Sequence, residues 1–480
     1  MLSEKEPPDK IKRRIYTFIK WRHGMEFSTE ELAPIAEQIA ELCVRKMERE
    51  QDRQIMALEN GLRQGLKKLG GMVLTSTLSQ AERELEREIA CQCGGTLHYQ
   101  RRREAKIESL FGWVEYERSY YAECECSKGK APLDEEFGLE PGKVTPGLAR
   151  LLALAGLGLP FGESTNWIDE FLLLELSENS IRKETQSFGQ YQVDCEEKLK
   201  GKCQDEAYLQ ERIRTETEQP EQLYGSLDGA HVRIEDPEEN EKWRETKVGC
   251  WYRVEVVPVN QQTQRHRKKK EIGYQALRAK DQQYYCDIQE VDDFEPLFWA
   301  TGCQAKADLA KELVFLGDGA KWIWRLVGTH YPNAVQIVDW YHAEEYLEKV
   351  AKDAFPNGEK RNTWLEDART SLWWGDTSFV IRACQALALR SEEASTALTY
   401  FRNNEHRMQY DHFRGKGYMI GSGTIESACK QIVSHRLRCS GAQWKVEGAR
   451  LTAKARAAWL SGKSSWETLC SLRAKLPLAA

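Results

Sequence analysis

The chain has 480 residues, and at about 150 residues per domain this length predicts roughly three structural units. Hydrophobic residues make up 41%, charged residues 30%, and the net charge is −6, a composition that excludes collagen-like, low-complexity and wholly disordered proteins. No stretch approaches the ~18 uninterrupted apolar residues of a membrane-spanning helix, and the first residues contain no apolar leader. The sequence therefore predicts a cytoplasmic, multidomain protein with no membrane partner.

The charge is unevenly distributed along the chain. Residues 421–480 contain ten Lys/Arg and three Asp/Glu, a net of +7, whereas the first 420 residues contain 59 basic and 72 acidic residues, a net of −13. This segregation predicts that a polyanion binds at the basic C-terminal end.

Four of the fourteen cysteines form two close pairs, Cys91-Gln-Cys93 and Cys124-Glu-Cys126, around a strand-like stretch at 107–121. The other ten are scattered and are expected to be reduced, mostly buried thiols. Two cysteine pairs around a hairpin are the layout of a zinc ribbon, in which four thiolates hold a tetrahedral ion. Zinc ribbons usually use C-x2-C pairs, and both pairs here are C-x-C. The spacing leaves two alternatives open, a structural Zn2+ site or reduced structural thiols.

Helical patterns occupy two parts of the N-terminal half. A helix is predicted over residues 29–69. Ser28-Thr-Glu-Glu31 supplies capping residues at its start, and apolar residues recur at helical intervals up to Gly70-Gly71. The pattern is helical again over 145–200.

Within that second region, two short helices are predicted at 167–176 and 179–188. The pair fits either a helix-turn-helix or an ordinary helical hairpin.

After Pro220 the pattern changes to strands. Apolar, β-branched runs occur at 223–234, 248–259, 314–316 and 335–338. A helical segment at 322–328 separates the last two runs and predicts a parallel crossover, hence an α/β layer. A helical pattern follows over 342–413, and a last helix is predicted at 424–437.

Three acidic residues are candidates for chemistry, each with a plainer alternative. Asp228 lies in a strand-like segment, where a carboxylate is costly unless paired or metal-bound, but Asp-Gly is also a hairpin-turn signal. Asp318 ends a strand-like run, where ligands bind in α/β sheets, or it caps the next helix. Glu426 lies at the edge of an apolar helix stripe, or it is a first-turn glutamate paired with Lys430. As a set, the three suit hard cations together with substrate phosphates.

At these residues the sequence resembles the DDE-type transposases of insertion sequences, in particular the ISKra group. The segments that carry the resemblance are Ser226-Leu-Asp-Gly229, Leu316 to Trp324 and Gly421 to Lys430. Asp339-Trp-Tyr-His342 resembles an Asp-x-x-His element that these enzymes carry after the second Asp. The run 436–444 and the cysteine layout ending in Pro132-Leu-Asp are also similar, so the resemblance covers about residues 85–460.

The resemblance implies a multidomain α+β protein with an RNase H-like α/β catalytic core that a helical insertion interrupts. It implies that Asp228, Asp318 and Glu426 hold two Mg2+ (or Mn2+) ions for the cleavage and joining of DNA. Asp339 and His342 would lie beside them, where His342 contacts a phosphate, supports a ligand or is structural. The implied partners are double-stranded DNA, as element ends and target, and a second copy of the chain, in association with the nucleoid.

DNA contacts are predicted from three basic groups. The basic run within 264–270 would contact phosphates, with a solvated loop as its alternative, and the candidate helix 179–188 would read bases. The predicted DNA-binding residues are Arg265, Arg267, Lys268, Lys269, Lys270, Arg182, Lys183, Arg436 and Arg438.

The predicted organisation has six parts. They are an N-terminal helical region (1–88), a zinc-ribbon-like β module (89–140), a helix-turn-helix-like DNA-binding region (141–215), the first part of the RNase H-like core (216–345), a helical insertion (346–417), and the last core helix with the basic C-terminal region (418–480). One rival is a catalytically silent DNA-binding regulator with the same fold. A glycosidase with paired carboxylates is a second rival, which the basic segments disfavour because neutral sugars need no such field.

Overall fold

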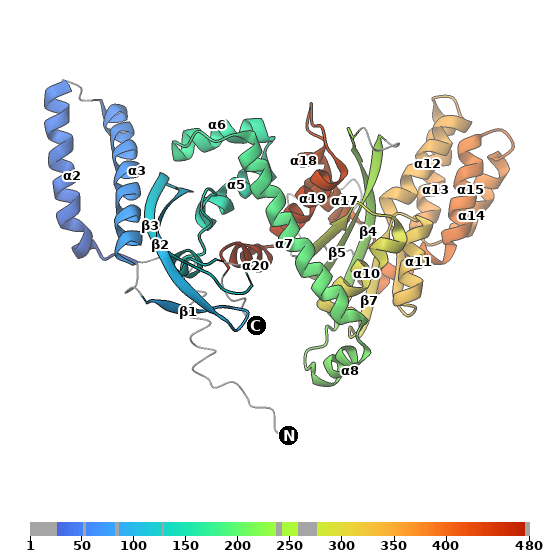
Figure 1. Ribbon diagram of the computed structural model, residues 1–480. Coiled ribbons are helices and arrows are strands. Elements are labelled where there is room, and N and C mark those ends of the chain that lie inside the picture. The colour runs from blue at the N-terminus through green and yellow to red at the C-terminus, as the bar shows by residue number, and fades with distance from the viewer. Residues whose placement is uncertain are drawn as a thin grey trace. The chain divides into compact units, whose positions relative to one another are not determined.

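The computed structural model describes residues 26–50, 54–81, 86–126, 129–236, 242–257 and 276–475. The chain is a mixed α+β protein with two separate sheets (Figure 1). It divides into two compact units. Unit 1 comprises Met1–Gly156, Phe161–Glu184 and Thr468–Ala480, and unit 2 comprises Leu157–Pro160 and Thr185–Glu467. Among the described residues, no helix is long and apolar enough to cross a membrane.

In the described part of unit 1, the first elements are two long helices, α2 (Thr29–Glu50) and α3 (Ile55–Gln80). The predicted capping residues are confirmed, because Ser28 and Glu31 exchange hydrogen bonds of 2.7 and 3.2 Å at the start of α2. The prediction that the helix ends before Gly70-Gly71 is wrong, since α3 continues through both glycines. A Cβ at Gly70 would lie 2.4 Å from the ring of Phe111, so this glycine admits a neighbouring side chain rather than ending the helix.

A three-stranded antiparallel sheet follows, made of β1 (Glu88–Ala90), β2 (Thr96–Ser109) and β3 (Gly112–Ala122) in that order. The strand-like stretch at 107–121 is thus a hairpin with its turn after Ser109. Ile107, Val114 and Tyr116 of this hairpin pack with Leu78 of α3 and Leu133 of α4 in one core cluster.

The other helices among the described residues of unit 1 are α4 (Pro132–Glu136), α5 (Pro146–Gly158), α6 (Phe161–Leu172), the first turns of α7 (Glu178–Gln204) and the end of α20 (Lys463–Arg473). The helix predicted at 167–176 ends early, because Arg63 and Lys67 of α3 donate to carbonyls at Glu170 and Leu173 and Leu173 has a φ of 55°. The second predicted helix is longer than expected, since α7 has 27 residues.

Unit 2 is built on a five-stranded sheet with the order β6-β5-β4-β7-β8 (Figure 1). Its strands are β4 (Gln222–Arg233), β5 (Trp243–Val257), β6 (Ala276–Asp287), β7 (Glu312–Gly317) and β8 (Val335–Val338). The first three pair as an antiparallel meander, whereas β7 and β8 continue parallel to β4. The predicted parallel crossover from β7 through α11 (Lys321–His330) to β8 is confirmed. Strand β6 had no counterpart among the predicted runs.

Helices cover both faces of this sheet. On one face lie α10 (Val291–Ala305) and α11, where Trp251 of β5 stacks on Phe298 at 5.6 Å. Against the other face pack α17 (Gly423–Cys429), a π-helical turn (Lys430–Ser434), α18 (His435–Leu437) and α19 (Val446–Leu460) (Figure 1). Helix α8 (Glu206–Thr215) follows α7.

A helical region separates β8 from α17, and the helical pattern predicted over 342–413 is confirmed. It contains α12 (Trp340–Ala354), α13 (Glu359–Trp373), α14 (Thr377–Leu387), α15 (Glu392–Asn404), a 3-10 turn (Glu405–Arg407) and α16 (Tyr410–Gly415). The helices α12 to α15 pack on one another beside the sheet (Figure 1).

A buried ion cluster joins α7, β6 and α19. Lys454 is 1% exposed, and its Nζ lies 2.7 Å from Oδ2 of Asp287 and also contacts the Glu196 carboxylate. Arg450 donates to Oδ1 of Asp287 at 2.7 Å. Each buried charge therefore has an opposite charge beside it.

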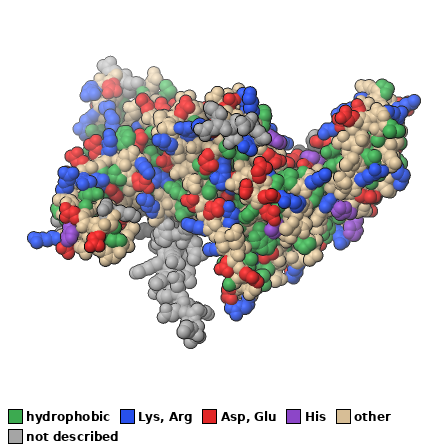
Figure 2. All heavy atoms as spheres, turned by 45° about the vertical axis from the view of Figure 1, so that its right-hand side comes forward, with side chains coloured by type: hydrophobic (Ala, Val, Ile, Leu, Met, Phe, Trp, Pro, Cys, Tyr) green, Lys and Arg blue, Asp and Glu red, His purple; other side chains and the backbone are tan. Residues whose placement is uncertain are grey.

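This cluster corrects the expectation of a basic C-terminal surface. Half of the ten basic residues beyond 420 are buried or half-buried: Arg436, Arg450, Lys454, Arg456 and Arg473. On the face seen in Figure 2, basic and acidic side chains of the described residues are interspersed. Three of these five, Arg450, Lys454 and Arg473, pair with the carboxylates of Asp287, Glu196 and Glu184, so their charge is not available to a polyanion.

We predict that Lys454→Met lowers the free energy of unfolding by about 3–5 kcal/mol, because it leaves Asp287 and Glu196 buried without their shared cation. Urea denaturation measures this loss. Lys463→Met, at an exposed lysine, is the matched control and should change stability by less than about 0.5 kcal/mol. Equal losses in the two variants would contradict a paired role for Lys454.

Candidate functional site

Asp228 lies within β4, where it pairs with Val248 of β5 in the antiparallel ladder. Of the two alternatives in the sequence, the strand is therefore confirmed and the Asp-Gly hairpin turn is wrong. The side chain is half-buried, and its Oδ1 accepts a hydrogen bond of 2.7 Å from the N–H of Gly229.

Asp318 directly follows β7, the parallel neighbour of β4. The ladder pairs Ser226 with Leu316, and the same register continued by two residues brings Asp318 level with Asp228. Asp318 Oδ1 accepts from the N–H of Ala320 at 2.8 Å, so the carboxylate stabilises the turn that leads into α11. Gly319 in this turn has a φ of 100°, and a Cβ there would lie 2.6 Å from the Tyr400 ring.

The two aspartates are close enough for the charge of Asp318 to affect the pKa of Asp228. Burial raises the pKa of Asp228, and the negative charge of Asp318 raises it further. Hydrogen bonds from Gly229 and from the thiol of Cys429 partly offset this increase. A cation placed between the carboxylates would remove the repulsion, which is the electrostatic condition of a metal site.

Asp339 follows β8 and is fully buried at 0% exposure. It is the N-cap of α12, with Oδ1 accepting from the N–H of His342 at 2.7 Å, while Oδ2 accepts from the N–H of Ser422. Burial alone would raise the pKa of Asp339, but the hydrogen bonds from His342 and Ser422 outweigh it and lower the pKa. Asp339 is therefore an ionised carboxylate that joins the start of α12 to the segment before α17.

Glu426 lies in the first turn of α17 and meets two residues that the sequence placed only in supporting roles. Ligand atoms of Asp339, His342 and Glu426 all lie within 4.8 Å of one another. Ser422 also donates to Oε1 of Glu426 at 3.4 Å. Glu426 is thus directed at this cluster, and the alternative of a plain first-turn glutamate paired with Lys430 does not describe its surroundings.

His342 carries the positive charge among these carboxylates. Its Nδ1 lies 3.7 Å from Oδ1 of Asp339, and the side chain is 30% exposed. Asp339 raises the pKa of His342 to about 9 against the opposing effect of burial, and Asp318 contributes in the same direction. The charge of His342 in turn opposes the increase in the pKa of Asp228. His342 therefore connects the Asp228–Asp318 pair electrostatically to the Asp339–Glu426 pair.

The structure brings all five sequence-predicted residues to one end of the sheet, but in two groups. Asp228 and Asp318 interact through their charges, and Glu426 directly joins Asp339 and His342. Helix α17 belongs to both groups, because Cys429, one turn after Glu426, contacts Asp228. Cys429 is buried and was not singled out in the sequence, where it reads as one more apolar position of a helix stripe.

The four paired cysteines form a second cluster, in unit 1. Cys91 Sγ lies 3.5 Å from Cys126 Sγ, Cys93 Sγ lies 3.3 Å from Cys124 Sγ, and all four can offer ligand atoms within 4.8 Å of one another. A tetrahedral zinc site with Zn–S bonds of about 2.3 Å has S–S edges of about 3.8 Å. The Gly95 N–H is the main cause of a lowered pKa of about 7 at Cys93. The cluster could therefore hold a structural metal such as zinc.

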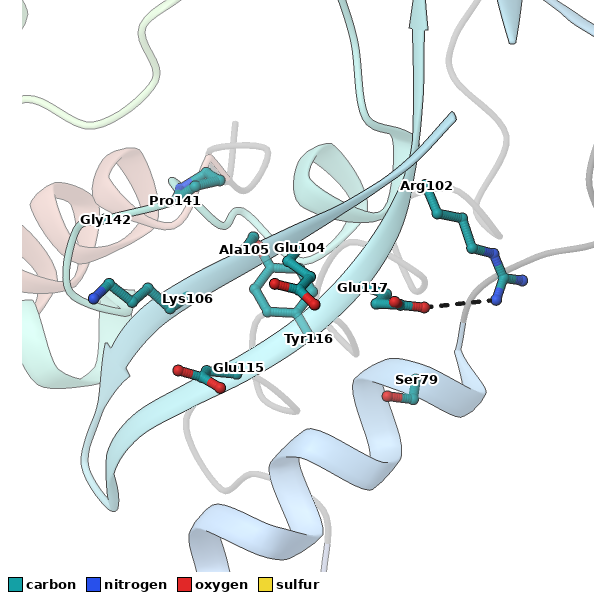
Figure 3. A pocket seen from close by; sticks show the side chains of 10 residues that line it. All are labelled: Ser79, Arg102, Glu104, Ala105, Lys106, Glu115, Tyr116, Glu117, Pro141 and Gly142. Atoms are coloured by element: carbon teal, nitrogen blue, oxygen red, sulfur yellow. Dashed lines mark ion pairs between the residues drawn. The ribbon is translucent and has the colours of Figure 1, made fainter. Parts of the chain in front are cut away.

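A cavity of about 730 Å³ in unit 1 lies between the end of α3, the β2–β3 hairpin and the segment at 141–142 (Figure 3). Charges of both signs line it, with Arg102 3.9 Å from Glu117, as the dashed line in Figure 3 marks. The acidic residues Glu104, Glu115 and Glu117 outnumber the basic ones. Among the described residues these solvent-facing charges form no cluster of metal ligands, unlike the end of the unit 2 sheet.

The predicted DNA-binding residues differ in their exposure to solvent. Arg182 and Lys183 are exposed on α7, and Arg438 is exposed while its Nε donates to the His231 carbonyl at 2.6 Å. Arg436 is a correction, because it is 2% exposed and its guanidinium packs 5.0 Å from the Trp444 ring centre. The predicted residues Arg265, Arg267, Lys268, Lys269 and Lys270 lie outside the described residues.

Comparison with known proteins found no protein-family model and no curated protein that matches this chain.

We predict that Asp339→Asn destabilises the protein by about 2–3 kcal/mol in urea denaturation, because an amide has one acceptor oxygen for two backbone donors. Asp376→Asn is the matched control. Asp376 caps α14 with one oxygen, Oδ1, which accepts from the N–H of Phe379 and from the hydroxyl of Ser378, each at 2.9 Å. An amide keeps one acceptor oxygen, so the loss at Asp376 should be less than about 1 kcal/mol. Equal losses in the two variants would show that Asp339 is only a helix cap.

We further predict one zinc ion per purified chain by elemental analysis, since four thiols converge at the cluster. Cys124→Ser should lose the ion, whereas Cys195→Ser, outside the cluster, should keep it. Wild-type protein with far less than one ion per chain would identify the four cysteines as reduced structural thiols.

Proposed function

We propose that this chain is a metal-dependent DNA transposase that cleaves insertion-sequence ends and transfers the strands to target DNA. One observation carries the proposal. Carboxylates from four separate segments, at Asp228, Asp318, Asp339 and Glu426, gather at one end of the unit 2 sheet around a single histidine. A chain with a purely structural use for this end of the sheet would gain nothing from the repulsion between Asp228 and Asp318.

The architecture of unit 2 supports an RNase H-like core. Three antiparallel strands and two parallel ones meet at β4, and helices pack on both faces. The helical region from α12 to α16 enters between β8 and α17, where the resemblance implies an insertion. The acidic residues follow the order that the resemblance implies, on the first strand, after the fourth strand and on the helix after the insertion.

The donor atoms suit Mg2+ or Mn2+. Hard cations of this size bind one or two carboxylates together with substrate phosphates, and Asp228 and Asp318 offer such oxygens side by side. Glu426 would supply the third carboxylate. When bound, two ions would stabilise the attacking and leaving oxygens of an in-line phosphoryl displacement.

The residues around these carboxylates have distinct tasks. Asp339 uses both oxygens to hold the backbone at His342 and Ser422, so it acts mainly as a positioning residue for Glu426. His342, with a pKa of about 9, is protonated at neutral pH and is partly open to solvent. A protonated imidazole there can donate to a phosphate oxygen while it compensates the surrounding carboxylates.

DNA would be held outside this site by exposed cations. In the described part of the chain, Arg182, Lys183 and Arg438 remain available for phosphate contacts. Such contacts give affinity that falls steeply with salt, and sequence choice then depends on base contacts.

We expect Asp228→Asn, Asp318→Asn and Glu426→Gln each to reduce Mg2+-dependent strand transfer by at least about 1,000-fold, because each removes a charged metal ligand. A gel assay with DNA that carries the element ends measures transfer, and filter binding on the same DNA should change by less than about threefold. Glu359→Gln, at the exposed start of α13, is the control and should retain full transfer.

Substantial transfer by Glu426→Gln would contradict its assignment as a ligand. Wild-type protein that binds element ends but does not nick them with Mg2+ or Mn2+ would favour the catalytically silent regulator.

A further inference from the structure

Tyr341 is an exposed aromatic residue at the edge of the acidic site of unit 2. It is the second residue of α12, between the Asp339 cap and His342, and it is 59% exposed. Single exposed aromatic side chains are common on protein surfaces and need no explanation by themselves. Tyr341 differs in its position, because Asp339 and His342 both belong to the cluster that Glu426 completes.

The ring of Tyr341 lies against the backbone that leads to Glu426. A Cβ on Gly421 would lie 3.1 Å from Cε2 of Tyr341 and 3.5 Å from its Cδ2. The same Cβ would lie 3.9 Å from Oδ2 of Asp339, so Gly421 borders both the ring and the buried carboxylate. This contact engages one edge of the ring, and the absence of a side chain at Gly421 allows it.

The backbone of Tyr341 is fixed by the residue before it. The N–H of Trp340 donates to the carbonyl of Ile420 at 2.9 Å. The Trp340 ring packs on Trp373 and Tyr410, with ring centres 4.9 and 5.1 Å apart. A side chain on a backbone held in this way loses less conformational entropy when a ligand contacts it. Tyr341 is therefore a preorganised aromatic surface beside the acidic site.

The depth of the site gives such a surface a use. Asp228 is half-buried and Asp339 is fully buried, so the carboxylates lie below the surface that a regular duplex would touch. A phosphate approaches recessed groups more closely when the neighbouring base pair opens. Opening a pair costs free energy, and an aromatic ring recovers part of that cost by stacking on the unpaired base.

We propose that Tyr341 is a stacking platform for an unpaired base beside the scissile phosphate. The proposal rests on the proposed function, because it requires DNA at the carboxylates of unit 2. The base stacks on the exposed ring while His342, the next residue, donates to the adjacent phosphate. Every base has a π face, so Tyr341 selects DNA by the opening of its end and not by its sequence.

A binding measurement without metal tests the stacking directly. The probe is element-end DNA with a mismatched 2-aminopurine next to the cleavage position, because the fluorescence of this base falls when it stacks on an aromatic ring. Wild-type protein should quench the probe and bind it at least about fivefold more tightly than fully paired DNA. Tyr341→Ala should lose both effects, whereas Tyr341→Phe and Tyr341→Trp should keep them. Tyr208→Ala, at an exposed tyrosine of α8, is the matched control and should behave as wild type.

Strand transfer gives a second measurement, which separates stacking from a structural role. With Mg2+, Tyr341→Ala should slow the transfer of fully paired ends by at least about 10-fold. It should slow the transfer of mismatched ends by less than about threefold, because the mismatch removes the need to open the pair. An equal defect on both kinds of end would show that Tyr341 only supports the fold, and would overturn the proposal.

The two measurements also separate this proposal from the function on which it rests. Wild-type protein that transfers strands, with Tyr341→Ala equal to Tyr208→Ala in quenching and in transfer, would overturn the stacking role alone. Wild-type protein that quenches the probe through Tyr341 but transfers no strand would support stacking and contradict the transposase. Wild-type protein that leaves the probe bright would overturn the stacking role whatever its activity.

Discussion

The carboxylate of Asp339 is the interaction on which the geometry of the site depends. It is fully buried, and it accepts hydrogen bonds from His342 and from Ser422, which lies 83 residues further along the chain. Those 83 residues include the whole helical region from α12 to α16. A buried carboxylate is stable only where hydrogen-bond donors surround it. The hydrogen bond from Ser422 to Asp339 therefore holds the segment before α17 at the end of β8. Glu426 and Cys429 then reach Asp339 and Asp228 from the same helix.

The resulting site holds excess negative charge at the edge of an apolar core. Asp228 keeps a raised pKa even with hydrogen bonds from Gly229 and Cys429, because burial and the charge of Asp318 raise it. Asp339 has a lowered pKa, because the hydrogen bonds from His342 and Ser422 outweigh its burial. His342 compensates part of the excess charge. The two aspartates therefore differ in their surroundings: Asp339 holds the backbone at His342 and Ser422, whereas a cation beside Asp228 would be needed to offset the burial and the charge of Asp318. Elsewhere in unit 2 a buried carboxylate is neutralised by basic side chains: Lys454 and Arg450 both pair with Asp287.

Local patterns predicted most elements of unit 2, because strands and crossover helices follow from short apolar runs. They also identified the acidic positions singly. They could not show that Asp228-Gly229 belongs to a strand and not to a turn, since that depends on pairing with β5 and β7. Nor could they show that Asp339 holds the site together, because this role depends on its hydrogen bond with Ser422, which is distant in sequence.

Burial explains the errors in reading charge and helix length. Arg436 and Lys454 look like surface cations in the sequence, yet both are enclosed by unit 2. Gly70 looks like a helix end, yet it admits the ring of Phe111 within a continuous helix. In each case tertiary contact overrides a local preference.

The most direct test of the account is a crystal of the chain soaked in Mn2+ and measured for anomalous scattering. We predict a Mn2+ peak within bonding distance, about 2.2 Å, of carboxylate oxygens from both Asp228 and Asp318, with Glu426 reaching the same or an adjacent ion. Mn2+ bound at other sites while these carboxylates remain without an ion would contradict a metal-dependent active site at this end of the sheet.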